Sequence, residues 1–323
     1  MRVVTPGTLV EDNLLPSSAN NYLAALVADG DVCGLAWCDV STGEFACLQG
    51  SGESVARELD RLLPAELLLA PGATPPSGLT ATLTPLARFD AGESGASLLK
   101  HFGAAVVDGL GLGGQRLAAG AAGVVVEYLA ENQKAALGHI MSVRLARTGE
   151  HMLVDGAARR NLEIFEPLRG ESAKAATLLG VLDETATPMG ARLLRRWLGQ
   201  PLLDPVEISR RQDAVQVFIG SAVRRGRVRQ PLGRTPDMER VLARVSAAAA
   251  SSLTPSTPRD LIALRRGLEA VPELRVLLEP SQIADEAEKA AAEEMLRGLH
   301  PCVETAALIA AGIADDPGPS GVI

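Results

Sequence analysis

The hydrophobic pattern of this 323-residue chain changes near Gly138, and this change constrains the fold more than any other feature. Before it, short apolar runs alternate with stretches whose apolar residues recur every three or four positions. After it, long stretches of helical spacing dominate. Alternating strands and helices are typical of an α/β domain, whereas amphipathic helices alone build an all-α domain. The chain is therefore predicted to fold as α/β followed by all-α.

The expected elements follow from periodicity and turn residues. In the first part we expect helices at residues 20–28, 54–63, 94–102 and 115–136, and strands at 32–39, 44–48, 66–70 and 83–89. Asp39–Gly43 supplies turn residues for a hairpin between the first two of these strands. In the second part we expect short strands at 142–147 and 151–153, and helices at 172–182, 188–198, 207–219, 260–268, 284–299 and 303–314.

The first part is acidic. Up to Ile140 the chain carries 7 Lys and Arg against 15 Asp and Glu, so the formal charge of −8 lies entirely there. Binding to a phosphate backbone depends on neutralising cations, so this part suits a protein partner better than a nucleic acid. Aromatic residues are only 3% of the chain, which means that its cores must be aliphatic.

Nothing in the sequence predicts a membrane protein. No segment reaches the roughly 18 consecutive apolar residues of a membrane span, and Pro and Gly interrupt the N-terminus where a signal peptide would be continuous. The four cysteines lack a CxxC pair and are expected to be reduced thiols of a cytoplasmic protein. They are Cys33, Cys38, Cys47 and Cys302.

The segment Gly109–Gly114 matches the GxGxxG pattern of dinucleotide-binding loops. Such a loop should follow the first strand of its domain, whereas this one comes after at least three expected strands. A GxxxxGK[ST] P-loop is absent from the sequence. We therefore expect no cofactor to bind this chain.

A metal-dependent nuclease is one alternative. It would need several converging carboxylates, for which Asp39, Glu44, Glu58 and Asp60 are the candidates. Glu58 and Asp60 are two positions apart on an expected helix, so they point to different faces. The four histidines are scattered, and no nucleophile motif occurs. We predict no catalytic residue and no metal ligand.

A stand-alone DNA-binding module is the other alternative. Its candidate contacts are Arg224, Arg225, Arg227 and Arg229. No aromatic residue lies beyond Phe218, so stacking on bases is not available there. A solvated turn between helices, or an intramolecular contact with acidic surface, is the preferred interpretation of this cluster.

An ordered series of motifs resembles the start of the helical core of the MutS family of DNA mismatch-repair proteins. The motifs are Arg159–Ile164, Leu178–Asp183, Thr187–Leu198, Pro201–Leu202, Ile208–Val215 and Arg234–Arg240. Val3–Thr8 resembles the linker that follows the family's mismatch-reading domain, and Asp39–Phe45 resembles the first hairpin of its connector domain. The resemblance covers essentially the whole chain. Within it, Arg192, Arg195 and Arg196 are expected to reach carboxylates on neighbouring helices.

The resemblance implies a linker at residues 1–10, an RNase H-like connector domain at 11–138, and an incomplete helical core or lever domain at 139–323. It implies a non-catalytic scaffold that relays ATP- and mismatch-linked conformational change. The other MutS domains would be partners, and through them mismatched double-stranded DNA. The family's Phe-x-Glu mismatch reader and P-loop are missing, so ATP and Mg are expected to bind elsewhere. An engineered or truncated chain is the expectation.

The resemblance also implies a docking surface for MutL on the helix before the glycine-rich loop. Leu98, Leu99 and Phe102 have the spacing of its inward face. The exposed candidates for the MutL contact are then Gly95, Ala96, Ser97 and Lys100.

Overall fold

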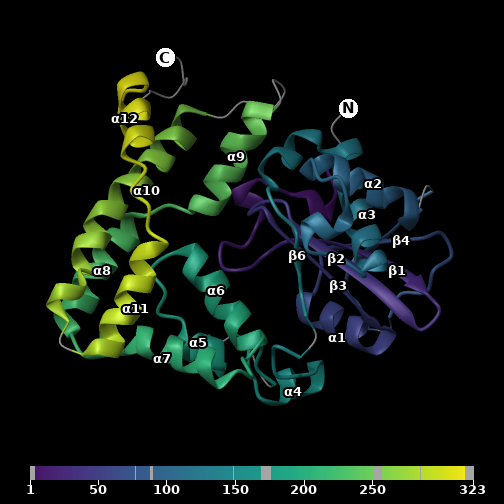
Figure 1. Ribbon diagram of the computed structural model, residues 1–323, viewed down its shortest axis with the longest axis horizontal. Helices are drawn as coiled ribbons and strands as arrows, with labels where there is room; N and C mark the ends of the chain where they lie inside the picture. The colour runs from purple at the N-terminus through teal and green to yellow at the C-terminus, as the bar shows by residue number, and fades with distance from the viewer. Residues whose placement is uncertain are drawn as a thin grey trace. The chain divides into compact units, whose positions relative to one another are not determined.

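The computed structural model divides the chain into two compact units (Figure 1). The α/β unit comprises Met1–Gly149, Leu153–Leu182 and Leu242–Pro255, and the helical unit comprises Glu150–Met152, Asp183–Val241 and Ser256–Ile323. The structure describes residues 4–76, 78–87, 90–147, 149–168, 176–250, 257–283 and 285–316. A mixed sheet with helices, followed by helices alone, is what the change of hydrophobic pattern predicts.

A mixed sheet forms the centre of the α/β unit. Its described strands are β1 Tyr22–Asp29, β2 Val32–Asp39, β3 Glu44–Ser51, β4 Glu66–Leu69, β5 Thr82–Pro85 and β6 Arg144–Leu145. They lie in the order β5-β4-β1-β2-β3-β6. The first three strands form an antiparallel meander, while β4 and β5 extend it in parallel beyond β1, and β6 pairs in parallel with β3.

The predicted hairpin turn joins β2 to β3. The backbone amides of Thr42 and Gly43 donate to the carbonyl oxygen of Asp39 at 3.2 and 2.9 Å. Gly43 has a φ of +80°, a conformation that only glycine adopts without strain. The turn residues seen in the sequence are therefore the ones that the hairpin needs.

The helix predicted at residues 20–28 is wrong, because β1 occupies Tyr22–Asp29. This strand lies between β2 and β4, and Leu23, Ala24 and Ala25 are all fully buried. A strand covered on both faces loses the alternation of apolar and polar residues that identifies a strand in sequence. Its apolar run then cannot be distinguished from part of a buried helix.

Other predicted strands are confirmed at 32–39, 44–48 and 66–70, with β3 three residues longer than expected. The strand predicted at 83–89 shortens to β5, and residues 88 and 89 lie outside the described part. The segment at 142–147 shortens to β6, and the segment at 151–153 shortens to a single bridge between His151 and Leu202.

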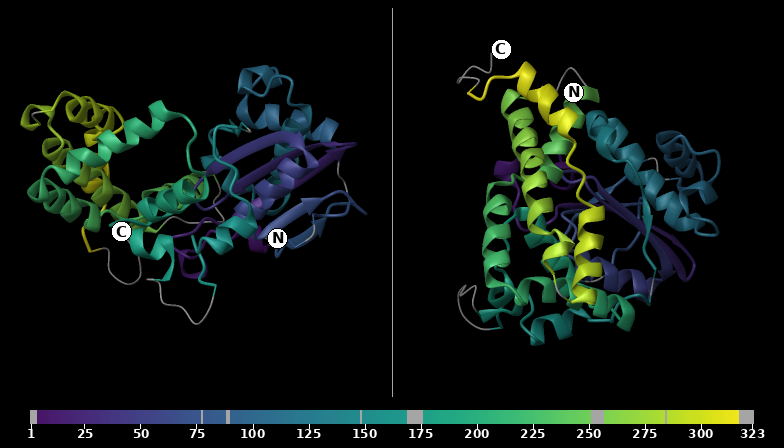
Figure 2. Two further views of the ribbon diagram at one scale, coloured as in Figure 1. Left: turned by 90° about the horizontal axis from the view of Figure 1, so that it is seen from below. Right: turned by 60° about the vertical axis from the view of Figure 1, so that its left-hand side comes forward.

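Helices cover both faces of the sheet (Figures 1 and 2). The α-helices described in this unit are α1 Gly52–Leu62, α2 Ala91–Phe102, α3 Arg116–Asn132, α4 Gly156–Asn161 and α5 Leu178–Leu182. Short 3-10 helices are η1 Pro6–Thr8, η2 Asp12–Leu14, η3 Val107–Leu110 and η4 Lys134–His139. α1 packs on one face through Val55 and Leu59, and α2 and α3 build the core on the other. Of the helix predicted at 172–182, residues 172–175 lie outside the described part.

Small residues let α3 approach the sheet closely. A Cβ atom on Gly34 of β2 would lie 2.2 Å from the carbonyl oxygen of Leu117 in α3, and one on Gly123 would lie 1.9 Å from the carbonyl oxygen of Ser94 in α2. Both contacts are possible only for glycine. The helix predicted at 115–136 is confirmed as far as Asn132, after which η4 follows.

The helical unit is built from capped helices. Its described members are α6 Pro188–Gly199, α7 Pro205–Ile219, α8 Ala222–Arg234, α10 Pro258–Leu277, η6 Pro280–Gln282, α11 Glu286–Arg297 and α12 Val303–Gly312; α9 Met238–Ala250 begins in this unit. Proline opens α6, α7 and α10, where its missing amide proton costs nothing. The side chain before each proline caps the helix by accepting a backbone hydrogen bond; these N-caps are Thr187, Asp204 and Thr257.

The apolar core of this unit is small. α10 packs against α8 and α12, and α7 packs against α11 (Figure 2). One buried cluster consists of Val217, Ile283 and Ala292, while large side chains such as Val215 and Leu308 are exposed. None of the helices in the described ranges is both long and apolar enough to cross a membrane.

A buried ion pair links α6 to the start of α9. Arg192 is 4% exposed, and its two terminal nitrogens donate to the two carboxylate oxygens of Asp237 at 2.7 Å each. Arg192 also donates to Glu239 at 2.6 Å. Burial alone would lower the pKa of Arg192, but these two carboxylates raise it well above its usual range. The expectation that Arg192 reaches carboxylates on another helix is confirmed.

We expect Arg192→Ala to destabilise the helical unit by about 3–5 kcal/mol, because it leaves Asp237 buried without its main partner. The matched control is Arg210→Ala, whose half-exposed pairs with Glu207 and Glu294 are screened by solvent, so its loss should change stability far less. Chemical unfolding followed by circular dichroism measures both. Equal losses in the two variants would contradict the prediction.

A pair of glycine substitutions tests the contact between α2 and α3. Gly123→Ala should cost about 1–3 kcal/mol, since its Cβ atom would overlap the Ser94 carbonyl. Gly95→Ala meets nothing within 4 Å, and removing a helical glycine should stabilise by about 0.5–1 kcal/mol. Thermal unfolding gives the sign of each change. A shift of the same sign in both variants would show that close packing is not the cause.

Candidate functional site

The helix α2 carries the residues that the sequence assigns to a partner contact. Asp90 caps it by accepting from the amides of Gly92 and Glu93 at 2.8 and 3.2 Å. Gly103 ends it in the left-handed conformation, with φ +64°. Both signals, an Asp N-cap and a Gly C-cap, are those expected of a short surface helix.

The inward face of α2 agrees with the prediction at Leu98 and Phe102, whereas Leu99 is half-buried and lies outside the core cluster. Leu98 is fully buried in the core, and Phe102 packs against the same core. The stacked rings of Phe45 and Phe102 have centroids 6.4 Å apart. α2 is therefore fixed to the unit by side chains at the predicted spacing.

Two serines of α2 are tied to α3. The hydroxyls of Ser94 and Ser97 each donate to one carboxylate oxygen of Glu127, at 2.7 Å in both cases. Hydrogen bonds to a charged acceptor are stronger than those between neutral groups. Glu127 therefore clamps the two helices together.

This clamp corrects one part of the predicted surface. Ser97 was expected to be exposed, but it is half-buried and bonded to Glu127. Gly95 is also half-buried, whereas Ala96 and Lys100 are exposed. The helical period alone predicts Ser97 on the exposed face, because it carries no information about the Glu127 carboxylate on α3. The available surface of α2 thus centres on Ala96 and Lys100.

The glycine-rich segment Gly109–Gly114 is a connection between η3 and α3. Gly111 and Gly114 both have φ +73°, so the glycines permit the turns of this loop. Between them Leu112 is fully buried in the core. In this structure the GxGxxG segment is therefore a turn that Leu112 holds to the core and that leads into α3.

The first amides of α3 already have a partner. The side-chain oxygen of Gln49 accepts from the amides of Leu117 and Ala118, at 2.8 and 3.4 Å. A pyrophosphate bound at a helix N-terminus would need such donors. Gln49 therefore occupies the place that the dinucleotide interpretation requires.

The four candidate carboxylates do not converge on one point. Asp39 is fully buried and accepts from the amide and hydroxyl of Ser41, while Glu44 accepts from the hydroxyl of Tyr22. Asn20 donates to both of these carboxylates. In the parts of the chain that the structure describes, no group of three His, Cys, Asp or Glu residues could hold a metal ion.

The other two carboxylates belong to ion pairs with arginine. Glu58 pairs with Arg61 at 2.7 Å on the same helix, and Asp60 pairs with Arg159. Their different partners agree with the prediction that they point to different faces. The arrangement favours structural roles for all four acids over a two-metal nuclease centre.

The ring of His139 packs over the hairpin turn. Its Nε2 atom lies 2.7 Å from the carbonyl oxygen of Val40. Burial lowers the pKa of His139, although Val40 and the nearby Asp39 act in the opposite direction. The ring is therefore neutral near pH 7, with its proton on Nε2, and it stabilises the turn rather than binding a metal.

The arginine cluster lies on a helix and not in a turn. Ser221 caps α8 by accepting from the amide of Arg224 at 3.2 Å, so the helix extends through Arg224, Arg225, Arg227 and Arg229. Arg224 donates to the carbonyl of Val217, and Arg225 to that of Phe218, at 3.2 and 2.9 Å. These two arginines neutralise the C-terminal end of α7, where cations are favourable.

Arg229 of the cluster, and Arg234 further along α8, also form contacts within the helical unit. Arg229 donates to the backbone carbonyl of Glu184 at 2.6 Å, and Arg234 pairs with Glu273 at 2.7 Å. Arg227 is exposed. The predicted intramolecular contact is found for Arg224, Arg225 and Arg229, but these three donate to backbone carbonyls, and the predicted acidic surface is approached by Arg229, 4.0 Å from the Glu184 carboxylate.

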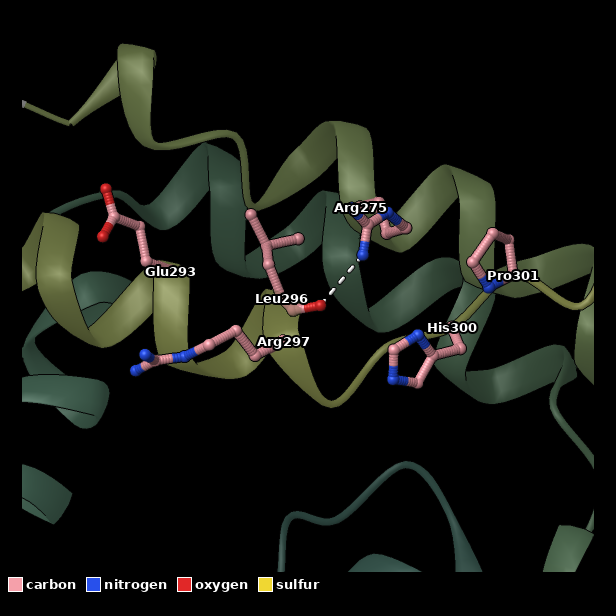
Figure 3. Close-up of a pocket in the computed structure, with 6 residues that line it drawn as sticks. All are labelled: Arg275, Glu293, Leu296, Arg297, His300 and Pro301. Carbon is pink, nitrogen blue, oxygen red and sulfur yellow. Dashed lines mark hydrogen bonds between the residues drawn. The ribbon is translucent and has the colours of Figure 1, made fainter.

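An open hollow lies between the ends of α10 and α11 (Figure 3). It is lined by Arg275, Glu293, Leu296, Arg297, His300 and Pro301. Arg275 donates to the carbonyl oxygens of Leu296 and Leu299 at 2.9 and 2.6 Å, so its guanidinium closes the end of α11. This arginine therefore supports the fold rather than binding an anion.

Two acids with structural roles are not predicted from the sequence. Glu66 is 1% exposed at the start of an apolar strand, and the half-buried Glu127 accepts from both serines. A lone carboxylate within an apolar run was a usable signal for Glu66, because a buried charge requires several donors. The sequence contained no comparable signal for Glu127, since its helical neighbours made an exposed position equally reasonable.

Comparisons with known proteins identify relatives over both parts of the chain. A family model described as MutS domain II matches residues 21–141, and one described as MutS domain III matches residues 157–320. The chain is similar to DNA mismatch repair protein MutS of Symbiobacterium thermophilum, with 40% identity over 98% of this chain and 36% of the relative. It is also similar to MutS of Roseiflexus castenholzii, with 37% identity over 96% of this chain and 32% of the relative. The chain spans about a third of the length of these curated relatives.

We expect Ser97→Glu to destabilise the α/β unit by about 1–3 kcal/mol, because its carboxylate would face Glu127 and replace a hydrogen bond with repulsion. The neighbouring Ala96→Glu places the same charge in solvent and should change stability by about 0.5 kcal/mol or less. Urea unfolding compares the two. If both variants are as stable as the parent, Glu127 does not clamp α2.

Proposed function

Because the chain belongs to the MutS family of DNA mismatch-repair proteins, we propose that it forms the connector and the first part of the helical core of such a protein. In this role it is a scaffold without catalysis of its own. It relays conformational change between the parts of the protein that use ATP and those that hold DNA. The carrying observation is that β1–β5 with α1–α3 lie within the segment that matches MutS domain II, whereas α5–α12 lie within the segment that matches MutS domain III.

The connector in this proposal has an RNase H-like fold. The support is the sheet itself, in which an antiparallel meander of three strands continues into two parallel strands on the β1 side. Helices on both faces fit the same architecture. The proposal concerns the fold alone, because a shared fold does not imply a shared catalytic activity.

The helical unit suits a relay because it combines rigid parts with few apolar contacts. Long helices such as α10 transmit displacement along their axes, and 20 residues extend about 30 Å. The buried pair of Arg192 and Asp237 fixes α6 to the start of α9. Movement passed through such elements requires that they stay intact while they shift.

The partner proposed for α2 is MutL. The exposed face around Ala96 offers close approach, and Lys100 offers a positive charge for orientation. Within the described residues Lys100 forms no ion pair, so its charge is available. Gly95 and Ser97 support this face from within rather than contacting the partner directly.

The two alternatives are less well supported. A nuclease would need the carboxylates of Asp39, Glu44, Glu58 and Asp60 to converge, and each has other partners. A DNA-binding module would need free arginines, and most of those on α8 are engaged within the helical unit. In this proposal ATP, Mg and mismatched DNA are bound by other parts of a MutS protein, and this chain binds no cofactor.

Binding of the 323-residue chain to purified MutL tests the proposal. We expect saturable binding, and an affinity at least ten-fold lower for the double variant Ala96→Glu, Lys100→Glu, since it turns a neutral and a positive position acidic. Calorimetry or surface plasmon resonance gives both dissociation constants. Parallel titration with mismatched DNA should show only weak binding that weakens further with salt.

The matched control is Glu53→Lys on α1, which changes an exposed charge on the other face of the sheet. It should leave MutL affinity unchanged. An unaltered affinity in the folded double variant would remove α2 from the interface. Absence of any MutL binding by the parent chain would overturn the docking role as a whole.

A further inference from the structure

The buried carboxylate of Glu66 accepts four hydrogen bonds. Its Oε1 atom accepts from the hydroxyls of Thr84 and Tyr128, at 2.7 and 2.8 Å. Its Oε2 atom accepts from the hydroxyl of Thr5 and the amide of Gly7, at 2.5 and 3.0 Å. A buried charge is stable only when it is satisfied in this way. Half of the donors come from the segment that enters the α/β unit.

That segment, Thr5–Thr8, is shaped to fit the site. Thr5 and Thr8 form a capping box around η1, and Pro6 begins the 3-10 turn. A Cβ atom on Gly7 would lie 2.8 Å from the Cβ atom of Glu66, so only glycine can approach so closely. The turn chemistry seen in the sequence is therefore a docked motif.

Further hydrogen bonds hold the segment on either side. Asn21 donates to the carbonyl oxygen of Pro6 at 2.8 Å, and Gln133 donates to that of Thr8 at 2.6 Å. Burial and the Glu66 carboxylate raise the pKa of Tyr128 to about 12, so its hydroxyl stays protonated and donates. The Glu66 carboxylate on β4 is thus bonded both to α3, through Tyr128, and to the entering segment, through Thr5 and Gly7.

We propose that Glu66 is a latch that fixes the entering segment Thr5–Thr8 to the α/β unit, so that this segment opens and closes as one piece. In this proposal the segment is not a flexible linker. When the chain immediately before Thr5 moves, the hydrogen bonds to Glu66 transmit that movement to β4 and α3. Opening would break the bonds from Thr5 and Gly7 to Glu66, together with those from Asn21 to Pro6 and from Gln133 to Thr8. It would leave the bonds from Thr84 and Tyr128 to Glu66 in place. The carboxylate would keep two donors, which makes a local opening less costly than unfolding.

Native-state hydrogen exchange of the whole chain tests the latch at single amides. Glu66→Gln keeps the shape of the side chain but replaces one acceptor oxygen with a donor. Thr5→Val removes the hydroxyl that donates to Glu66 and that also lies 3.1 Å from the Thr8 hydroxyl and 3.3 Å from the Tyr128 hydroxyl, and it leaves the side chains of the sheet unchanged. In both variants we expect the Gly7 amide to exchange at least ten-fold faster, while amides of β1 and β2 change by less than two-fold.

Glu127→Gln is the matched control, because that carboxylate also accepts two hydroxyls in the same unit but touches no part of the entering segment. It should leave the Gly7 amide unchanged. The proposal fails if Gly7 exchange is unaltered in Thr5→Val, or if all amides of the sheet accelerate by the same factor. Should Glu66→Gln not fold, Thr5→Val alone decides the outcome.

Discussion

The close packing of α3 on the sheet is the constraint on which the α/β unit depends. Its helical backbone reaches β2 where Gly34 has no side chain, and Gly123 admits α2 on its other side. This approach places Glu127 within reach of the serines of α2 and Tyr128 within reach of Glu66. A bulkier α3 would separate these groups by more than a hydrogen bond can span, so the polar contacts follow from the small residues rather than the reverse.

The helical unit is held by a different balance of forces. Its buried apolar cluster is small, and much of its organisation comes from arginines that bind carboxylates or helix ends. Such contacts are directional, so they fix which helices meet without enclosing a large core. Burial alone would raise the pKa of Asp237, but Arg192 and Arg240 lower it below its usual range, and the pair stays charged. That combination fits the relay role that we propose for this unit.

The sequence was informative where the local pattern and the tertiary environment agree. The turn residues between β2 and β3 identified their hairpin, although both strands are buried on both faces. The amphipathic α1 and the capped helices were identified by periodicity and capping residues. The sequence failed for β1, because burial on both faces removes the pattern, and for Ser97, because its orientation depends on a carboxylate 30 positions away in sequence. The arginines of α8 were placed in a turn for a similar reason, since Gly226 weakened a helical pattern that Ser221 and the end of α7 stabilise.

Many polar groups of the described residues form hydrogen bonds within the chain, and this limits which ligands can bind at those groups. Gln49 accepts a hydrogen bond from an amide at the start of α3 that a phosphate would need. Glu66 accepts from the Gly7 amide of the entering segment, and Arg224 of α8 donates to the Val217 carbonyl near the end of α7. Groups already paired in this way must lose a partner before they can bind a ligand, which makes binding there unfavourable. On α2 the surface that remains consists of a small apolar side chain, Ala96, and an isolated charge, Lys100. Surfaces of that kind recognise another folded protein by shape, and they offer little to a free nucleotide or a metal ion.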